Sequence, residues 1–262
     1  MTEQNLGHIY ERRSSDFGPQ TYSDTEFAEK IAFALKLGSY NEGARILDAM
    51  SGPGKLADMP RQLLSGTSPQ FHFIDLSAAQ LHKITQGNPV VGDVRNLPYQ
   101  AETFDAVYAR YALKDLTADD QVRALAELVR SIKPGGAFIL ADMYAPSNQV
   151  LPWLNKQHSM KQEFSGRNTA RVGHCNIRTI PGWIDSLDAS GLKASVVLMH
   201  LSQVTTTDWQ KSNQVNEEQL HQLDKFILSA PTEAVSAFNI RSEGNKVMID
   251  YPICIIRGEK FK

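Results

Sequence analysis

Four short apolar runs of this sequence each end in an aspartate, and these carboxylates are the residues best placed to do chemistry. They are Asp48, Asp75, Asp93 and Asp142. An ionised carboxylate accepts hydrogen bonds from hydroxyl and amino groups and attracts a positively charged ligand. Directly after the first run come Gly52 and Gly54, where the backbone can approach a ligand that a Cβ would block. The combination predicts a site for an extended, nucleotide-like cofactor.

The elements that must hold these aspartates are short strands that alternate with helices. Runs of β-branched and aromatic residues predict strands, and capping residues followed by periodic apolar positions predict helices. The predicted strands cover residues 45–49, 71–75, 90–93, 104–108 and 137–141. The predicted helices cover about 23–35 and 54–64 and begin again at Ser77 and Thr117, the last being closed by a turn at 133–136. This alternation predicts an α/β fold with a doubly wound, mostly parallel sheet that binds its ligand at the carboxyl ends of the strands.

The alternation becomes less regular after residue 143. The further predicted elements are a helix over about 179–191, strands at 195–201 and 248–256, and a helix at 217–229. We divide the chain into an N-terminal helical cap segment, residues 1–43, and a main domain, residues 44–262. Insertions at about 144–178 and 204–240 are expected to cap one face of the sheet, and the second could equally form a dimer surface.

The composition narrows the function classes. The chain has 262 residues, of which 42% are hydrophobic and 21% charged, and its net charge is −2, so no overall basic field attracts nucleic acid. Cys175 and Cys254 lack the spacing of a metal site or a disulfide framework, and we predict no metal. We find no leader-like start and no apolar run of the roughly 18 residues that a membrane helix needs. We therefore expect a cytoplasmic monomer or homodimer that acts without membrane or nucleic acid.

Two kinds of cofactor fit the glycine turn. Residues 52–57 match the pattern GxGxxA, and Asp75 stands near the position of a ribose-binding acid, so a nicotinamide dinucleotide is one alternative. Asp48, however, lies four residues before Gly52, where a carboxylate would repel a pyrophosphate and would suit a ligand that carries an amino group. The residues therefore favour the second kind and leave a nicotinamide-dependent oxidoreductase as the alternative.

A set of motifs between residues 90 and 136 indicates the class of cofactor more closely. These motifs are Gly92-Asp93, Leu97-Pro98, Phe104-Asp105, Tyr108-Ala-Arg-Tyr-Ala-Leu113 and Lys133-Pro-Gly-Gly136. With the glycine turn, they resemble the class I S-adenosylmethionine-dependent methyltransferases, and most closely the small-molecule group of quinone-biosynthesis C-methyltransferases, over residues 44–143. The resemblance implies a Rossmann-like, seven-stranded sheet whose last strand, 248–256, is antiparallel. It also implies S-adenosylmethionine as cofactor and methyl transfer to a small molecule as activity.

The resemblance also implies a role for each cofactor-site residue. Asp48 would lie near the methionine amino group, Asp75 would accept both ribose hydroxyls, and Asp93 would accept from the adenine amine. The remaining implied positions are Ala49, Met50, Ser51, Gly52 and Gly54 in the turn, Leu76 and Val94 beside the adenine, and Ala109, Arg110 and Tyr111 facing the methionine part. Met50 departs from the glycine that the family usually has there. This departure leaves open a protein that binds the cofactor without methylating.

The acceptor must be held by the caps. Residues 151–180 contain five basic residues and one acid, which favours either a solvated insertion or contact with an anionic acceptor that bears a carboxylate or phosphate. The candidate substrate-contacting residues are Lys114, Tyr144, Arg171, His174 and Arg178. His174 and Tyr144 are also the candidate catalytic residues, since an imidazole is a base near neutral pH. The sequence predicts no catalytic dyad.

Overall fold

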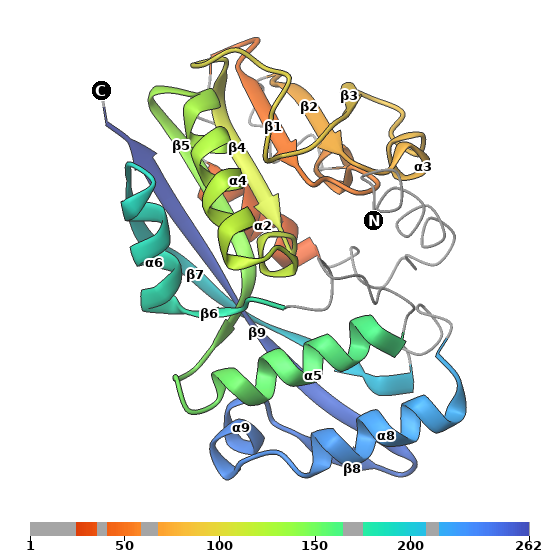
Figure 1. Ribbon diagram of the computed structural model, residues 1–262. Coiled ribbons are helices and arrows are strands. Elements are labelled where there is room, and N and C mark those ends of the chain that lie inside the picture. The colour runs from red at the N-terminus through yellow and green to blue at the C-terminus, as the bar shows by residue number, and fades with distance from the viewer. Residues whose placement is uncertain (1–24, 36–40, 59–67, 165–174, 208–214, 262) are drawn as a thin grey trace.

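The structure is a computed structural model that describes residues 25–35, 41–58, 68–164, 175–207 and 215–261. Its centre is one sheet with the strand order β3-β2-β1-β4-β5-β9-β7 (Figure 1). The bounds are β1 Arg45–Ala49, β2 Gln70–Asp75, β3 Asn88–Val91, β4 Phe104–Arg110, β5 Ile132–Ala145, β7 Leu192–Thr205 and β9 Lys246–Lys260. β9 runs antiparallel to both of its neighbours, and the other pairs along this path are parallel. The predicted mostly parallel, doubly wound α/β sheet with an antiparallel last strand is confirmed.

The register brings the carboxyl ends of the central strands to one edge. Ala49 at the end of β1 pairs with Ile74 of β2 and with Ala109 of β4, and Arg110 pairs with Ala141 of β5. Apart from the half-buried Arg110, these strand residues are buried aliphatic side chains, as expected for parallel strands covered on both faces. The residues that follow each strand therefore meet along this edge.

Helices cover both faces of the sheet. α4 (Ala118–Ser131) and α6 (Ile180–Ala189) pack on one face through Leu125, Leu128 and the fully buried Trp183. α2 (Thr25–Leu35) lies on the other face, where Leu35 is fully buried (Figure 1). The helix starts follow the sequence, since the Thr117 side chain accepts from the Asp120 N–H and Thr179 accepts from Gly182.

A second group of elements lies beyond the carboxyl edge. β7 and β9 are 14 and 15 residues long, their far ends pair with each other, and β9 also pairs with β8 (Arg241–Glu243). α5 (Leu151–Phe164), α8 (Glu217–Leu228) and α9 (Thr232–Ala237) lie beside this ribbon in the lower part of Figure 1. Trp153 of α5 stacks on Phe226 of α8 and on Phe238, which joins these helices through one apolar cluster.

Three local predictions differ from the structure. Residues 133–136 belong to β5 rather than to a free turn, because Ile132 already pairs with Phe104 and Gly136 lies so close to the Asp105 carbonyl that a Cβ would be 2.8 Å from it. The helix expected over 54–64 is a 3-10 turn, Lys55–Asp58, in its described part. The helix after Ser77 is only α3, Ala78–Leu81, although Ser77 caps it as expected.

The insertion 144–178 leaves the sheet and returns to it, because β6 (Arg178–Thr179) pairs with Tyr144 and Ala145. None of the described helices combines the length and hydropathy that crossing a bilayer requires.

Candidate functional site

The turn after β1 has the backbone that its glycines predict. Gly52 and Gly54 have φ values of 53° and 67°, and the Gly54 N–H donates to the Ser51 carbonyl. A Cβ on Gly54 would lie 2.5 Å from Ile84, whereas one on Gly52 would meet nothing within 4 Å. Gly54 is thus required by packing, and Gly52 faces open space. Beside it, the enclosed Ser51 Oγ has no hydrogen-bond partner among the described residues.

Asp75 connects this turn to β2. One carboxylate oxygen accepts from the Gly52 N–H at 2.8 Å, and the other accepts from the Ser77 N–H at 2.9 Å. Burial raises the pKa of this carboxyl, which its backbone donors oppose. Each oxygen retains a second lone pair, so the carboxylate is fixed in place and can still accept from two neighbouring hydroxyls.

Asp48 is the most buried acid of the turn, with 4% of its surface exposed. Burial raises its pKa to about 8, the Arg110 guanidinium opposes this shift, and the nearby Asp75 adds to it. A positively charged ligand would stabilise the ionised form of this carboxyl, because the charge of the ligand offsets the cost of desolvating the carboxylate. We refer to Asp48, Ser51 and Asp75 as the turn cluster.

Asp93 is held by protein groups already. The Arg95 Nε–H donates to both carboxylate oxygens of Asp93, at 2.9 and 3.0 Å, and the Arg95 guanidinium also donates to Asp120. Val94 is buried beside this ion pair and Leu76 is half-buried. The role of Asp93 toward an adenine amine stays a prediction, and the structure adds that Arg95 fixes its position.

The end of β4 supplies the residues expected beneath the methyl donor. Ala109 is fully buried, and Tyr111 turns the chain with a φ of 51° while its N–H donates to the Ala141 carbonyl. The Arg110 guanidinium lies 5.1 Å from the centre of the Tyr111 ring. Met50 has a similar left-handed φ of 55°, so two non-glycine residues with strained backbones flank this end of the site.

Lys114, expected to contact substrate or solvent, is buried instead. Its ammonium lies 3.5 Å from Asp115 and 3.9 Å from Asp142, and it donates to the Tyr111 carbonyl. Burial raises the pKa of Asp142 to about 6, which Lys114 opposes. Lys114 therefore acts first as the internal counter-ion of two carboxylates.

Sequence reasoning missed the partner of this ion group. His158, from α5, places Nε2 at 3.2 Å from the Asp115 carboxylate, and Gln162 on the next turn donates to the same oxygen at 2.8 Å. The spacing of His158 and Gln162 puts both on one helix face, but nothing in the sequence identifies Asp115 as their common acceptor. We refer to Lys114, Asp115, Asp142 and His158 as the lysine cluster.

Two other acceptor-side candidates, Tyr144 and Arg178, are register partners on β5 and β6, but their side chains have different partners. Tyr144 places its hydroxyl 3.6 Å from the Met199 sulfur, and Arg178 donates to Gln121 at 2.9 Å and lies over the Trp183 ring. Arg171 and His174 lie outside the described residues. Their roles stay predictions.

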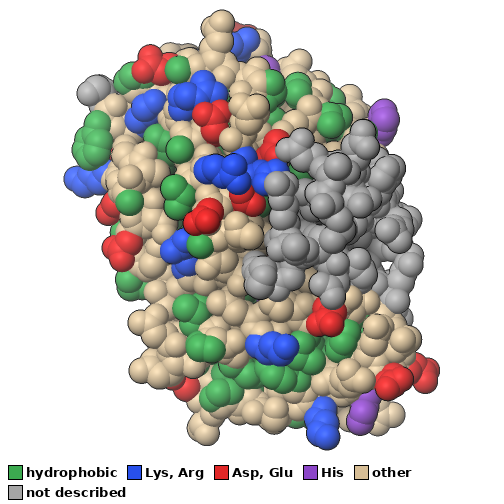
Figure 2. Space-filling model, in the orientation of Figure 1, with side chains coloured by type: hydrophobic (Ala, Val, Ile, Leu, Met, Phe, Trp, Pro, Cys, Tyr) green, Lys and Arg blue, Asp and Glu red, His purple; other side chains and the backbone are tan. Residues whose placement is uncertain are grey.

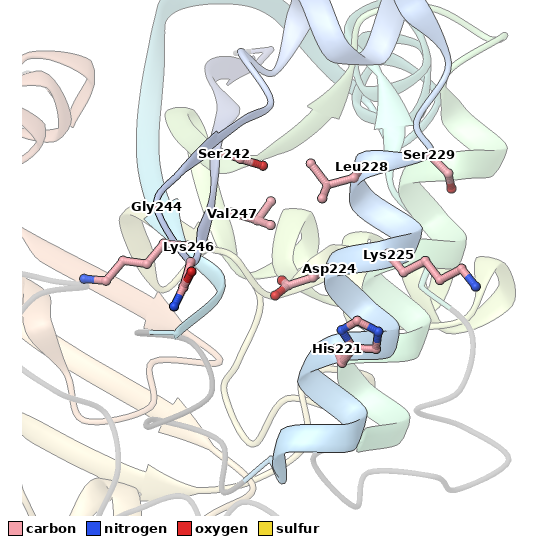
Figure 3. Close-up of a pocket in the computed structure, with 10 residues that line it drawn as sticks. His221, Asp224, Lys225, Leu228, Ser229, Ser242, Gly244, Lys246 and Val247 are labelled. Carbon is pink, nitrogen blue, oxygen red and sulfur yellow. The ribbon is translucent and has the colours of Figure 1, made fainter.

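A hollow of about 490 Å³ lies elsewhere, between α8 and the β8–β9 hairpin (Figure 3). Asp224 points toward Val247 across it, whereas Lys225 points away. Its lining includes none of the residues predicted from the sequence, and we assign it no role.

Residues 47–140 match the family model described as a methyltransferase domain. With the strand order and the glycine turn, this match supports a class I S-adenosylmethionine-dependent methyltransferase domain with S-adenosylmethionine as its cofactor.

Curated relatives include methyltransferases of quinone biosynthesis and a tRNA methyltransferase. The ubiquinone/menaquinone biosynthesis C-methyltransferase UbiE of Bordetella avium is 30% identical over 145 residues, and demethylmenaquinone methyltransferase of Mycobacterium sp. (strain KMS) is 35% identical over 139 residues. The matches cover 48% and 53% of this chain, and the chain spans 56% and 57% of these relatives. A tRNA (carboxymethyluridine(34)-5-O)-methyltransferase of Arabidopsis thaliana is 34% identical over 53% of this chain and 35% of its own length.

Solved structures share the fold. The YcgJ protein of Bacillus subtilis superimposes with a TM-score of 0.75 at 19% identity, covering 89% of this chain and 98% of that one. Geranyl diphosphate methyltransferase in complex with S-adenosylmethionine gives a TM-score of 0.53 at 14% identity over 90% and 85%. The [4+2]-cyclase SpnF gives 0.57 at 16% identity over 100% and 97%. These likenesses establish the fold and leave the acceptor open.

Proposed function

We propose that this protein transfers the methyl group of S-adenosylmethionine to a small aromatic acceptor that carries a hydroxyl group, such as a quinol. The observation that carries the proposal is the turn cluster, in which a fixed Asp75 and a buried Asp48 stand on either side of the open Gly52. The quinone-biosynthesis relatives supply the acceptor class.

The chain's own residues bind and orient the cofactor in this proposal. Asp75 accepts the two ribose hydroxyls with the lone pairs that Gly52 and Ser77 leave available. Asp48 attracts the amino group of the methionine part, and Ser51 Oγ gains a hydrogen-bond partner. Leu76, Val94 and Asp93 surround the adenine. Ala49, Met50, Gly54 and the segment Ala109–Tyr111 line the methionine part.

The bound sulfonium supplies a methyl group that is already activated for transfer. The protein must place the acceptor in line with that methyl group and exclude water, and such orientation is worth roughly 7–11 kcal/mol. An anionic substituent on the acceptor would use the basic residues of 151–180, but Arg178 is already bound to Gln121. A neutral quinol is therefore our first candidate and an anionic one the second.

Two rival functions remain for experiment. A nicotinamide-dependent oxidoreductase would place a pyrophosphate beside Asp48, which like charge disfavours. A protein that binds the cofactor without methylating would make the strained Met50 its distinguishing residue. An RNA acceptor is disfavoured because the net charge of −2 supplies no overall basic field. On the described part of the face in Figure 2, which carries α4 and α6, acidic and basic side chains are interspersed.

We further propose a cytoplasmic monomer or homodimer that acts without membrane or nucleic acid. Residues 1–43 would cap the cofactor site, and the insertions 144–178 and 204–240 would cap the acceptor side of the methyltransferase domain, 44–262.

The test combines binding with turnover. Calorimetry with S-adenosylhomocysteine and with NAD should give micromolar binding of the first alone. Incubation with methyl-tritiated S-adenosylmethionine and 1,4-dihydroxynaphthalene, or its 2-carboxylate, should then move the label into the organic extract. Binding of NAD alone would overturn the proposal. Cofactor binding without transfer to either naphthalene, other hydroquinones or tRNA would favour the protein that does not methylate.

A further inference from the structure

Three segments of the chain bring ionisable side chains together beside the end of β4. Asp115 ends the 3-10 turn Leu113–Asp115, His158 comes from α5, and Cys175 precedes β6. The candidate ligand atoms of these three residues lie within 4.8 Å of one another. Lys114, next to Asp115, donates to the Tyr111 carbonyl, so the group adjoins the segment expected to face the methyl donor.

The hydrogen bonds determine which imidazole nitrogen carries the proton. The Asp115 oxygen that His158 Nε2 approaches also receives the Gln162 amide and faces the Lys114 ammonium. That oxygen is therefore an acceptor, and Nε2 is the protonated nitrogen. Nδ1 then carries the basic lone pair, and it is enclosed without a hydrogen-bond partner among the described residues. Enclosed polar atoms without partners are rare in native proteins and call for an explanation.

Three explanations can be compared. A metal ion bound by Asp115, His158 and Cys175 would meet the Lys114 ammonium, 3.5 Å from the Asp115 oxygen. A nucleophilic thiolate is disfavoured because burial and neighbouring carboxylates raise the pKa of Cys175. A proton acceptor needs a neutral imidazole whose other nitrogen is bound to a carboxylate, and this arrangement is present.

We propose that His158 Nδ1 accepts the proton of the methyl acceptor's hydroxyl group, and that Asp115 positions the imidazole through Nε2. This proposal rests on the proposed function. It names a residue that the sequence analysis did not, in place of His174 and Tyr144.

The proposed step transfers a methyl group from sulfur to the acceptor and a proton from the acceptor to His158. The S–CH3 bond breaks and its electron pair stays on sulfur, while a new bond forms between the methyl carbon and the acceptor. The acceptor's hydroxyl proton moves to His158 Nδ1, and the imidazolium that forms faces the Asp115 carboxylate. For attack by a ring carbon, removal of the hydroxyl proton raises the electron density of the ring, and the ring proton leaves afterwards to water.

The test exploits acceptors of graded acidity. Substituted hydroquinones would be chosen whose hydroxyl pKa values range from about 10, the value of an ordinary phenol, to below the assay pH. For each acceptor, kcat of His158→Gln is divided by kcat of the unaltered chain, which cancels the acceptor's own reactivity. We expect a loss of about 10²–10⁴-fold for the weakly acidic acceptors. The loss should shrink to less than tenfold for acceptors that are already ionised.

Two controls separate catalysis from folding. His200→Gln alters a histidine of β7 that bonds Lys30, and it should leave kcat unchanged for every acceptor. The Kd of S-adenosylhomocysteine should be the same in both variants as in the unaltered chain. Nitrogen-15 NMR of labelled histidines at pH 7 should show the His158 signal as neutral with its proton on Nε2.

The outcomes are distinct. A loss in His158→Gln that is equal for all acceptors, no loss at all, or a proton on Nδ1 at pH 7 would overturn this inference and leave the proposed function intact. An unaltered chain that binds S-adenosylhomocysteine but methylates no hydroquinone overturns the proposed function, and the inference with it.

Discussion

The turn cluster and the lysine cluster lie on the same edge of the sheet, but they neutralise their carboxylates in opposite ways. Asp48 and Asp75 have backbone N–H donors and the guanidinium of Arg110 nearby. Asp115 and Asp142 have the buried ammonium of Lys114 between them. Burial raises the pKa of Asp48 to about 8 and that of Asp142 only to about 6.

This difference indicates what each cluster is for. A buried carboxyl whose pKa stays high despite a nearby guanidinium gains from a cationic ligand, but its ionised form destabilises the unliganded fold. A carboxylate with its own cation stabilises the fold and leaves nearby groups, such as the His158 Nδ1 lone pair, available for a neutral reactant. Substitutions in the two clusters should therefore affect different quantities.

The largest effect is expected from Lys114→Met. This substitution leaves Asp115 and Asp142 buried without their cation, and breaking a buried ion pair from one side costs about 3–5 kcal/mol. Urea unfolding should show this loss, and adding Asp142→Asn should restore part of it. Lys133→Met, which removes an exposed ion pair with Asp105, should cost less than about 1 kcal/mol. Similar small losses at both lysines would contradict the assigned role of Lys114.

Asp75→Ala should affect ligand binding most. Two hydrogen bonds from the ribose to a charged acceptor contribute roughly 1.5–3 kcal/mol each, so the Kd of S-adenosylhomocysteine should rise at least about 100-fold. The matched control is Asp105→Ala. Asp105 also accepts a hydrogen bond from a backbone N–H, that of Arg45, but it lies at the start of β4, away from the turn cluster. Calorimetry that finds equal losses in both variants would refute the assignment of Asp75.

Asp48 should make cofactor binding depend on pH. Its pKa is raised to about 8, so below that pH it must lose a proton before it can pair with the ligand's amino group. The Kd of S-adenosylhomocysteine should therefore rise by up to about tenfold for each unit by which the pH is lowered from 7.5 to 6. In Asp48→Asn, binding should be weaker and this slope should disappear. An unchanged slope would show that another group titrates.

The same shift predicts the stability of the unliganded chain. The ordinary pKa of this carboxyl is 3.8, and burial raises it to about 8 in the folded chain. Between these two pH values, Asp48 is protonated in the folded chain and ionised in the unfolded chain. Since the folded state then holds more protons, stability should fall as pH rises through this range. Asp48→Asn should reduce that decline, and it should raise Tm at pH 8.

The turn cluster could be predicted from the sequence and the lysine cluster could not. The glycines, Asp48 and Asp75 are local signals, because each lies at or just after the end of a strand that its apolar run defines. The sequence offered Lys114 only as a candidate substrate contact, since lysine is rarely buried. Its partner Asp142 lies 28 residues away, and its neighbour Asp115 bonds His158, which is 43 residues from Asp115. Only the fold brings such distant residues together.

The difference between local signals and distant contacts also explains which parts of the fold could be predicted. The mostly parallel sheet followed from the alternation of strands and helices, and the resemblance supplied the antiparallel last strand. The lengths of β7 and β9 did not follow, because their far ends are stabilised by pairing with each other and by packing of α8 and α9, which are non-local contacts.

Met50 gives the smallest expected effect and tests the departure from the glycine that the resemblance implies at this position, next to the turn cluster. Its φ of 55° costs a non-glycine residue roughly 1–2 kcal/mol, and its side chain packs against the apolar core beneath the sheet. Comparing Met50→Gly with Met50→Ala removes the packing difference, since both lack that side chain. We expect the glycine variant to be about 1 kcal/mol more stable in urea unfolding. At Ala126, exposed on α4, glycine should instead be about 1 kcal/mol less stable than alanine. If glycine is also the less stable at position 50, the left-handed φ of this residue carries no strain.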